Sequence, residues 1–221
     1  MKWLYLLVVI SMTSIASFSS EKDWENFNSS LLIEVTRPNA VYTCTGVAIS
    51  NSVILTAAHC LDGEIKRVKI FTSDSYDPKL TYLEINSFKL HPKYNPSKSK
   101  SHADIAKIMM KEKLPSTIKI HPIYKGSNPR GNLYRFGFGG RDKKNIRTVI
   151  TPQLRKMNLD EQIVELDDTF SKSGDSGGPI FLQNGITTEI LAIHSTYSHG
   201  PRGKFTLNPL LAPYIPWIFD N

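Results

Sequence analysis

Gly174-Asp175-Ser176-Gly177-Gly178-Pro179 surrounds one serine with three glycines in the last quarter of a 221-residue chain. Glycine adopts backbone angles that other residues resist, and it lets the backbone come close to a ligand. A nucleophilic serine needs a tight turn that exposes its hydroxyl, and it needs N–H groups aimed at a developing oxyanion. A glycine-rich surface turn is the alternative, but it would not account for Asp175 and Pro179. The segment therefore predicts a nucleophile at Ser176.

Two earlier segments supply the partners that such a nucleophile needs. Leu55–Cys60 is an apolar run that ends in two alanines, His59 and Cys60. Ser101–Ala106 places Asp104 beside apolar residues, where a buried carboxylate costs free energy unless it is paired. Taken singly, the pattern around His59 more often indicates a structural or surface histidine, and the segment around Asp104 is also compatible with an exposed loop aspartate. Taken together, the order His, Asp, Ser is one of the chain orders known for a catalytic triad.

Short β-branched or alternating runs, separated by Gly, Pro, Asn and Asp, indicate an all-β fold. Lys111–Pro129 is rich in Lys, Pro and His, and it is predicted to connect two halves. Leu210–Ile218 is predicted to form a short C-terminal helix that docks through Trp217 and Ile218. The strand candidates are Leu31–Thr36, Thr45–Leu55, Val68–Phe71, Tyr82–Leu90, Asn132–Phe138, Arg147–Thr151, Glu189–His194 and Lys204–Leu207.

The three motif segments resemble the signature segments of trypsin-like serine proteases. Weaker similarities extend the resemblance over residues 31–219, at Gly137-Phe138-Gly139, Ile193-His194-Ser195, Gly203-Lys204-Phe205-Thr206 and Trp217-Ile218. The resemblance implies two six-stranded antiparallel β-barrels packed with a catalytic cleft between them, and a short C-terminal helix. In this reading the peptidase domain covers residues 31–221. The first barrel covers about 31–115, the second about 125–207, and the helix about 208–219.

The resemblance also implies a role for each site residue. Ser176 attacks the scissile carbonyl, His59 acts as general base and acid, and Asp104 orients the imidazole. The N–H groups of Gly174 and Ser176 form the oxyanion hole. Phe170, Ser195, Tyr197 and Gly203 are the candidate substrate-binding residues. The substrate is a protein or peptide, and no metal or organic cofactor is implied.

The chain departs from that family in activation and in its specificity pocket. It lacks the Ile-Val-Gly-Gly segment whose freed amine pairs with the aspartate before the nucleophile. Asp175 is therefore expected to pair with another group, such as a lysine or a terminus made by signal peptidase. Our hypothesis is that signal-peptide removal alone gives the active form. Phe170 stands where a carboxylate would select Lys or Arg, and Lys172 stands where a cysteine usually braces the pocket. We therefore predict no strong Lys or Arg preference.

The first residues indicate export. Lys2 precedes an apolar run from Trp3 to Ile10, and small and polar residues follow. This pattern is typical of a signal peptide, cleaved after Ser14-Ile15-Ala16 or, as a second choice, after Ser17-Phe18-Ser19. The peptide would span residues 1–16 and leave residues 17–30 as an N-terminal segment. A membrane anchor is the alternative, but the apolar run is short for a bilayer.

Two further features bear on location and partners. Cys44 and Cys60 form an even pair, which in an oxidising compartment predicts a disulfide. The formal charge of +7 is scattered, without the basic stripe and interleaved aromatics of a nucleic-acid binder. We expect a secreted or periplasmic protein that is not membrane-anchored after processing and does not bind nucleic acid. The sequence gives no indication of the oligomeric state.

The sequence thus predicts a secreted serine endopeptidase that hydrolyses peptide bonds through a Ser-His-Asp triad and an acyl-enzyme intermediate. The alternative is a catalytically weak or inactive protease homologue that acts as a secreted binding protein. An esterase acting on small acyl substrates is a variant of the first reading, because the same residues suit acyl transfer in general.

Overall fold

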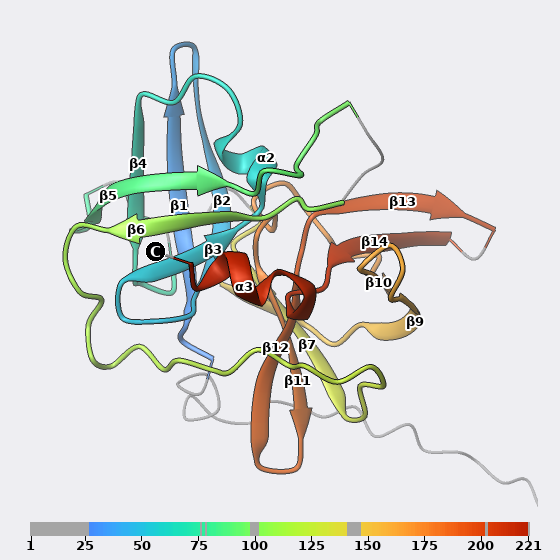
Figure 1. Ribbon diagram of the computed structural model, residues 1–221. Helices are drawn as coiled ribbons and strands as arrows, with labels where there is room; N and C mark the ends of the chain where they lie inside the picture. The colour runs from blue at the N-terminus through green and yellow to red at the C-terminus, as the bar shows by residue number, and fades with distance from the viewer. Residues whose placement is uncertain are drawn as a thin grey trace, which may run out of the picture.

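The computed structural model describes residues 27–220 except 76, 78, 98–101, 141–146 and 202. The predicted signal peptide and both of its cleavage sites lie outside the described residues. The described chain is almost entirely β, with short helical segments, so the all-β prediction is confirmed (Figure 1). No helix in this part of the chain is long and apolar enough to cross a membrane.

The first half is a closed barrel of six antiparallel strands in the order β1-β2-β3-β6-β5-β4. Along β1, Leu31, Ile33 and Val35 fill the barrel, whereas Leu32 packs on the other side against Phe71 and Phe138. This alternation follows from the two-residue period of a strand, and it lets one strand serve two cores. The strands are β1 (Ser30–Arg37), β2 (Ala40–Ala48), β3 (Val53–Thr56), β4 (Arg67–Phe71), β5 (Leu83–Leu90) and β6 (Ala106–Met110).

The second half holds eight described strands in two four-stranded sheets, ordered β13-β14-β10-β9 and β12-β11-β7-β8. Val164, Leu166, Ile180 and Leu182 join the two sheets through a shared apolar core. The β13–β14 ribbon extends away from the body, so the second half is more open than a single six-stranded barrel (Figure 1). The strands are β7 (Asn132–Gly137), β8 (Thr148–Ile150), β9 (Gln153–Asn158), β10 (Ile163–Asp167), β11 (Pro179–Asn184), β12 (Thr187–Ile193), β13 (Thr196–Gly200) and β14 (Gly203–Pro209).

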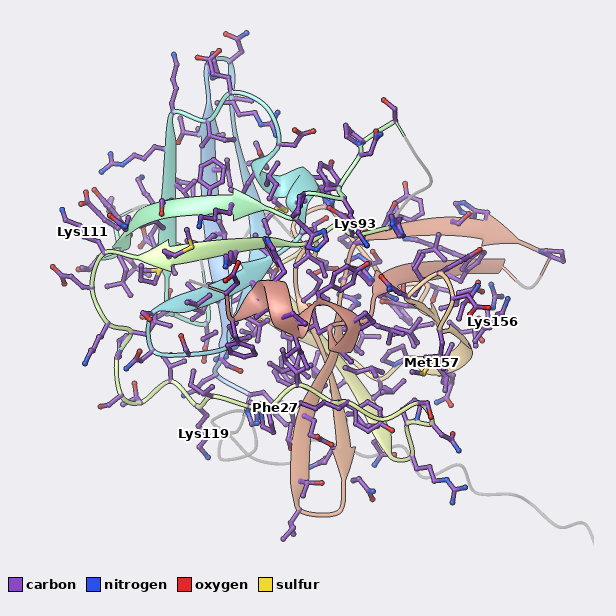
Figure 2. The ribbon with its side chains drawn as sticks, viewed as in Figure 1. Phe27, Lys93, Lys111, Lys119, Lys156 and Met157 are labelled. Atoms are coloured by element: carbon purple, nitrogen blue, oxygen red, sulfur yellow. A yellow bond between two sulfur atoms is a disulfide. The ribbon has the colours of Figure 1, made fainter. Side chains whose placement is uncertain are left out.

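An aromatic cluster joins the two halves. Phe27 precedes β1 and is almost fully buried, with its ring 4.9 Å from that of Phe136 and 5.1 Å from that of Phe181 (Figure 2). Val47 and Leu55 of the first half belong to the same core. Burial of large aromatic rings dominates such interfaces, so this cluster holds the halves in one orientation.

The C-terminal helix begins later than predicted. It comprises η1 (Ala212–Tyr214) and α3 (Ile215–Ile218), because Asn208 and Pro209 pair with β10 and extend β14. The Lys107 ammonium donates hydrogen bonds to the carbonyl oxygens of Trp217 (3.0 Å) and Asp220 (2.5 Å). The end of the chain is thereby tied back to β6 of the first barrel.

The predicted run Thr45–Leu55 is divided between β2 and β3, with a turn near Asn51. Cys44 of β2 is bonded to Cys60 of α2 (Ala58–Leu61), which confirms the predicted disulfide. The cross-link joins the barrel wall to the short helix that carries His59.

Replacing both cysteines with alanine should destabilise the fold. The disulfide closes a loop with a sequence separation of 16 residues, and a cross-link of that size contributes about 3 kcal/mol by restricting the unfolded chain. Urea denaturation followed by tryptophan fluorescence should show a loss of about this size. Wild-type protein in reductant should unfold like the double variant, and an unchanged midpoint would contradict this role.

Candidate active site

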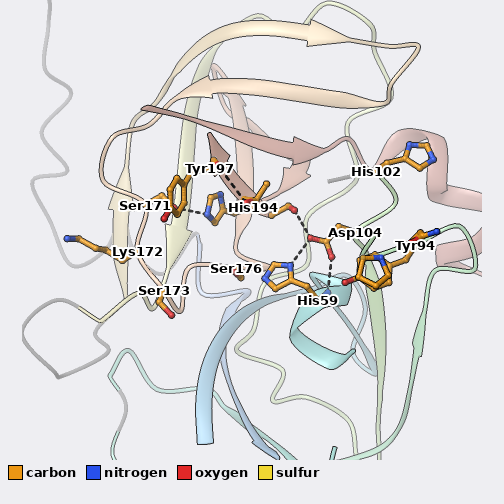
Figure 3. Close-up of a pocket in the computed structure, with 14 residues that line it drawn as sticks. His59, Tyr94, His102, Asp104, Ser171, Lys172, Ser173, Ser176, His194 and Tyr197 are labelled. Carbon is orange, nitrogen blue, oxygen red and sulfur yellow. Dashed lines mark hydrogen bonds and ion pairs between the residues drawn. The ribbon is translucent and has the colours of Figure 1, made fainter. Parts of the chain in front are cut away.

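His59 and Asp104 meet at one end of the first barrel. Imidazole Nδ1 lies 2.7 Å from Asp104 Oδ2, and the His59 backbone N–H donates to Oδ1 at 2.9 Å (Figure 3). Asp104 is only 4% exposed. Since a carboxylate only accepts hydrogen bonds, Nδ1 carries the proton, and Nε2 of neutral His59 is left as a base.

The Asp104 carboxylate is kept ionised by its neighbours. Burial alone would raise its pKa, but hydrogen bonds from the His59 ring, Ser195 and the His59 backbone, together with the electrostatic interaction with the imidazole, hold that pKa below its usual value. Ser195 Oγ donates to Oδ2 at 2.5 Å. Ser195 follows β12, so the second half contributes directly to the environment of a first-half residue.

His194 is adjacent in sequence to Ser195, but it is not a partner of Asp104 in the hydrogen bonds found. Its Nε2 contacts Ser171 Oγ at 2.9 Å, and its Nδ1 contacts Asn208 Oδ1 at 3.1 Å. Both ring nitrogens are therefore occupied within the second half. The histidine that faces Asp104 is His59.

The turn around Ser176 is anchored to the first barrel. The Ser176 carbonyl accepts a hydrogen bond from Thr45 N at 2.8 Å, and Gly177 N donates to the His194 carbonyl at 2.7 Å. Gly177 has a φ of +82°, and a Cβ there would lie 2.1 Å from Thr56 Oγ1. A side chain at this position would be strained and would clash with β3. The glycine thus allows the turn to approach the barrel.

These contacts bring the three sequence-predicted residues into one cleft. His59, Asp104 and Ser176 all line a cleft of about 510 Å³. Tyr94 and His102 stand on one side of Ser176, whereas Ser171, His194 and Tyr197 stand on the other (Figure 3).

The two predicted oxyanion donors, Gly174 N–H and Ser176 N–H, belong to this turn. The carbonyls before them accept hydrogen bonds from Gly140 N (3.2 Å, to Ser173) and Gly178 N (3.0 Å, to Asp175). A trans peptide places N–H opposite C=O, so both N–H groups point away from these donors. Neither N–H is paired with an acceptor in the described part of the chain.

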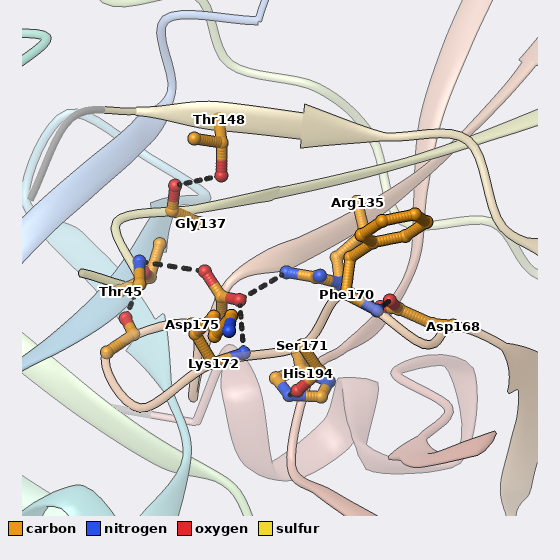
Figure 4. Close-up of polar contacts among 12 residues, drawn as sticks. Thr45, Arg135, Gly137, Thr148, Asp168, Phe170, Ser171, Lys172, Asp175 and His194 are labelled. Carbon is orange, nitrogen blue, oxygen red and sulfur yellow. Dashed lines mark hydrogen bonds and ion pairs between the residues drawn. The ribbon is translucent and has the colours of Figure 1, made fainter. Parts of the chain in front are cut away.

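Asp175 pairs with an arginine, not with a lysine side chain or a chain terminus as the sequence interpretation offered. Arg135 of β7 is completely buried, and its Nη1 lies 3.0 Å from Asp175 Oδ2 (Figure 4). Its Nε donates to Asp168. Asp175 also accepts hydrogen bonds from Gly139 N (2.8 Å) and Lys172 N (2.9 Å). One arginine therefore pairs with two buried carboxylates, and two backbone N–H groups donate to Asp175 as well.

Lys172 contributes to this network through its backbone only. Sequence reasoning missed Arg135, although an arginine inside the apolar run Asn132–Phe138 was a visible signal. A charge in a buried strand implies a buried partner, but the sequence does not say which one.

The candidate substrate-binding residues separate into two groups. Ser195 and Tyr197 line the cleft, but Phe170 and Gly203 are not among its lining residues. The Phe170 side chain is 58% exposed, because the preceding Asp168 is the residue held inside by Arg135. Asp168 Oδ1 accepts the Phe170 N–H at 2.9 Å. Ser171 and His194 line this part of the cleft instead, and sequence reasoning did not select them.

Metal ligands are not gathered here. Across the part of the chain that the structure describes, no group of three or more His, Cys, Asp and Glu side chains is arranged to hold a metal ion.

Comparisons with known proteins agree with this geometry. A family model described as Trypsin matches residues 22–218. Chymase of Mus musculus is 28% identical over 204 residues, covering 83% of this chain and 81% of the chymase. CLIP domain-containing serine protease B4 of Anopheles gambiae is 25% identical over 245 residues, covering 89% and 67%. Granzyme M of Rattus norvegicus is 25% identical over 207 residues, covering 80% and 78%.

Replacing Arg135 with methionine should destabilise the protein strongly. The change leaves Asp168 and Asp175 buried without a counter-charge, which typically costs about 3–5 kcal/mol. The free energy of unfolding, measured in urea, should fall by about that amount. Arg130→Met is the matched control, since Arg130 is exposed and the chemical change is the same. Equal, small losses in both variants would contradict the pairing.

Proposed function

The chain belongs to the trypsin family of serine proteases, and from this membership we propose that Ser176, His59 and Asp104 form its catalytic triad. The protein is a serine-type endopeptidase, a hydrolase of peptide bonds. The observation that carries the assignment is the pairing of His59 Nδ1 with the buried Asp104 carboxylate in the cleft that Ser176 lines.

The proposed reaction passes through an acyl-enzyme. Ser176 Oγ attacks the scissile carbonyl while His59 Nε2 accepts the hydroxyl proton, and His59 then gives that proton to the leaving amine. The N–H groups of Gly174 and Ser176 bind the oxyanion. Water next enters and attacks the acyl carbonyl while His59 Nε2 takes its proton. His59 then returns that proton to Ser176 Oγ as the acid product leaves. Asp104 stabilises the imidazolium in both steps.

Activation by removal of the signal peptide alone fits the Asp175 environment. The charge that orders this turn is supplied by Arg135, which is part of β7 and needs no proteolytic cut to form. Hence the chain does not require a new N-terminal amine at Asp175.

Export is the proposed route to the working location. A signal-like segment at residues 1–16 and the disulfide between Cys44 and Cys60 both favour a secreted or periplasmic protein. Its partners would be protein or peptide substrates outside the cytoplasm.

Fluorophosphonate labelling tests the triad. The purified mature protein should be labelled, Ser176→Ala should not, and His59→Ala should label at least about a thousandfold more slowly. His199→Ala, on the exposed face of β13, is the matched control and should label normally. A correctly folded wild-type protein that resists the probe would favour the inactive-homologue reading.

The independence from an N-terminal amine is tested separately. Mature protein carrying a short uncleaved extension should hydrolyse a peptide substrate at the same rate as protein without it, because Asp175 is already paired with Arg135. Rates are compared after active-site titration, and mass spectrometry checks that the extension remains. Activity that appears only after a cut near the N-terminus would refute the proposal.

A further inference from the structure

The half of the cleft beyond Ser176 is lined by polar and basic groups. Ser171–Ser173, Thr196 and Tyr197 line it together with the buried His194, and Ser171, His194 and Tyr197 lie close together (Figure 3). Lys172 is exposed. A substrate side chain that enters here therefore meets hydroxyls and a histidine rather than an apolar slot.

Lys204 is not among the residues that line the cleft, but its ammonium group contacts two residues that do, Ser171 and Tyr197. Its Nζ donates to the Ser171 carbonyl at 2.8 Å and lies 4.2 Å from the centre of the Tyr197 ring. No carboxylate has an ion-pair contact with Lys204 in the described chain. Its charge is thus available to a ligand beside Ser171.

The nearby carboxylates already have partners. Asp168 and Asp175 are both paired with Arg135, and Asp104 is paired with His59. Lys172 and Lys204 have no carboxylate partner among the ion pairs of the described residues, and their charges disfavour a lysine or arginine side chain of a substrate.

The hydrogen-bond partners of His194 determine which of its ring nitrogens carries the proton. Asn208 Nδ2 donates to the Val164 carbonyl (3.1 Å) and to Thr206 Oγ1 (3.0 Å), so Asn208 Oδ1 faces the ring. An amide oxygen accepts, so His194 Nδ1 must carry a proton. In the neutral ring, Nε2 then accepts the Ser171 hydroxyl proton.

His194 is neutral in the unliganded protein. Burial and the charge of Arg135 lower its pKa to about 4, although the carboxylates of Asp175 and Asp168 and the Asn208 hydrogen bond act in the opposite direction. A carboxylate placed beside Ser171 would add one more negative charge and raise that pKa.

We propose that this half of the cleft binds the substrate side chain on the acyl side of the scissile bond, and that it selects glutamate or aspartate there. Ser171 Oγ is the direct ligand of the carboxylate, Lys204 supplies the counter-charge, and His194 is a positioning residue behind Ser171. The inference rests on the proposed function and adds its substrate class.

Binding would reverse one hydrogen bond. His194 Nε2 takes up a proton from solvent and keeps it, and the new N–H donates a hydrogen bond to Ser171 Oγ. The Ser171 hydroxyl hydrogen is then free to point at the substrate carboxylate. One proton is taken up for each acidic side chain bound. The charged groups that act on His194 are Arg135, Asp175 and Asp168.

Peptides that differ only at this position provide the test. A glutamate peptide should be cleaved with a kcat/KM at least about tenfold higher than its glutamine counterpart, because the two differ in one charge-assisted hydrogen bond. Lysine and phenylalanine peptides should be poorer than the glutamate peptide. Equal cleavage of the glutamate and glutamine peptides, or a preference for lysine or phenylalanine, would overturn the inference.

Amino-acid substitutions test which side chains produce the preference for an acidic substrate residue. Ser171→Ala and Lys204→Met should each lower the glutamate-to-glutamine ratio by about tenfold. Lys156→Met, on exposed β9, removes the same charge elsewhere and should leave the ratio unchanged. An unchanged ratio in both pocket variants would overturn the assignment.

The pH dependence of KM tests the role of His194. KM for the glutamate peptide, relative to the glutamine peptide, should rise from about pH 6 to about pH 8 as the required proton becomes scarce. In His194→Gln this dependence should disappear. A pH dependence that persists in the variant would remove His194 from the mechanism.

Fluorophosphonate labelling distinguishes a failure of the acidic preference from a failure of the catalytic triad. Protein that is labelled at Ser176 but shows no acidic preference contradicts this inference and leaves the proposed function standing. Folded protein that is not labelled contradicts both.

Discussion

The ion pairing of Asp175 with Arg135 is the interaction on which the site depends. Asp175 directly precedes Ser176, and its buried carboxylate would destabilise the turn without a cation. Arg135 meets that need from β7 and holds Asp168 as well. Two backbone N–H groups share the remaining negative charge. Gly139 has no side chain because a Cβ there would lie 2.6 Å from Asp175 Oδ1. The conformation of the nucleophile turn is thus a consequence of charge balance in the second half.

A second set of contacts joins the halves across the cleft. The Ser176 turn is hydrogen-bonded to Thr45 of the first barrel, and Ser195 of the second half donates to Asp104. Phe27 packs into the core that both halves share. Since His59 and Ser176 come from different halves, any rotation between the halves would separate them. The buried aromatic cluster and these hydrogen bonds oppose that rotation, so the groups proposed to react are positioned before substrate arrives.

Local sequence patterns selected the residues of the proposed triad. The other contacts around the site depend on pairing between residues that are far apart in the sequence. The glycines around Ser176 and the small residues before His59 are local requirements, so they are visible in the sequence. The partner of Asp175 is 40 positions away, at Arg135. Phe170 was expected in the cleft, but the buried pair of Asp168 and Arg135 turns it outward. Ser171 and His194 likewise come into contact only when β12, β14 and the loop before Ser176 pack together, so the sequence does not reveal their pairing. The strand pattern predicted an all-β fold but did not reveal the split of Thr45–Leu55 or the open second half.

The source of the Arg135 charge also fixes when the nucleophile turn becomes ordered. A cation carried on a strand is present as soon as the strand pairs. Under the activation proposed above, the ordering of this turn is therefore coupled to the folding of the second half rather than to a later proteolytic cut.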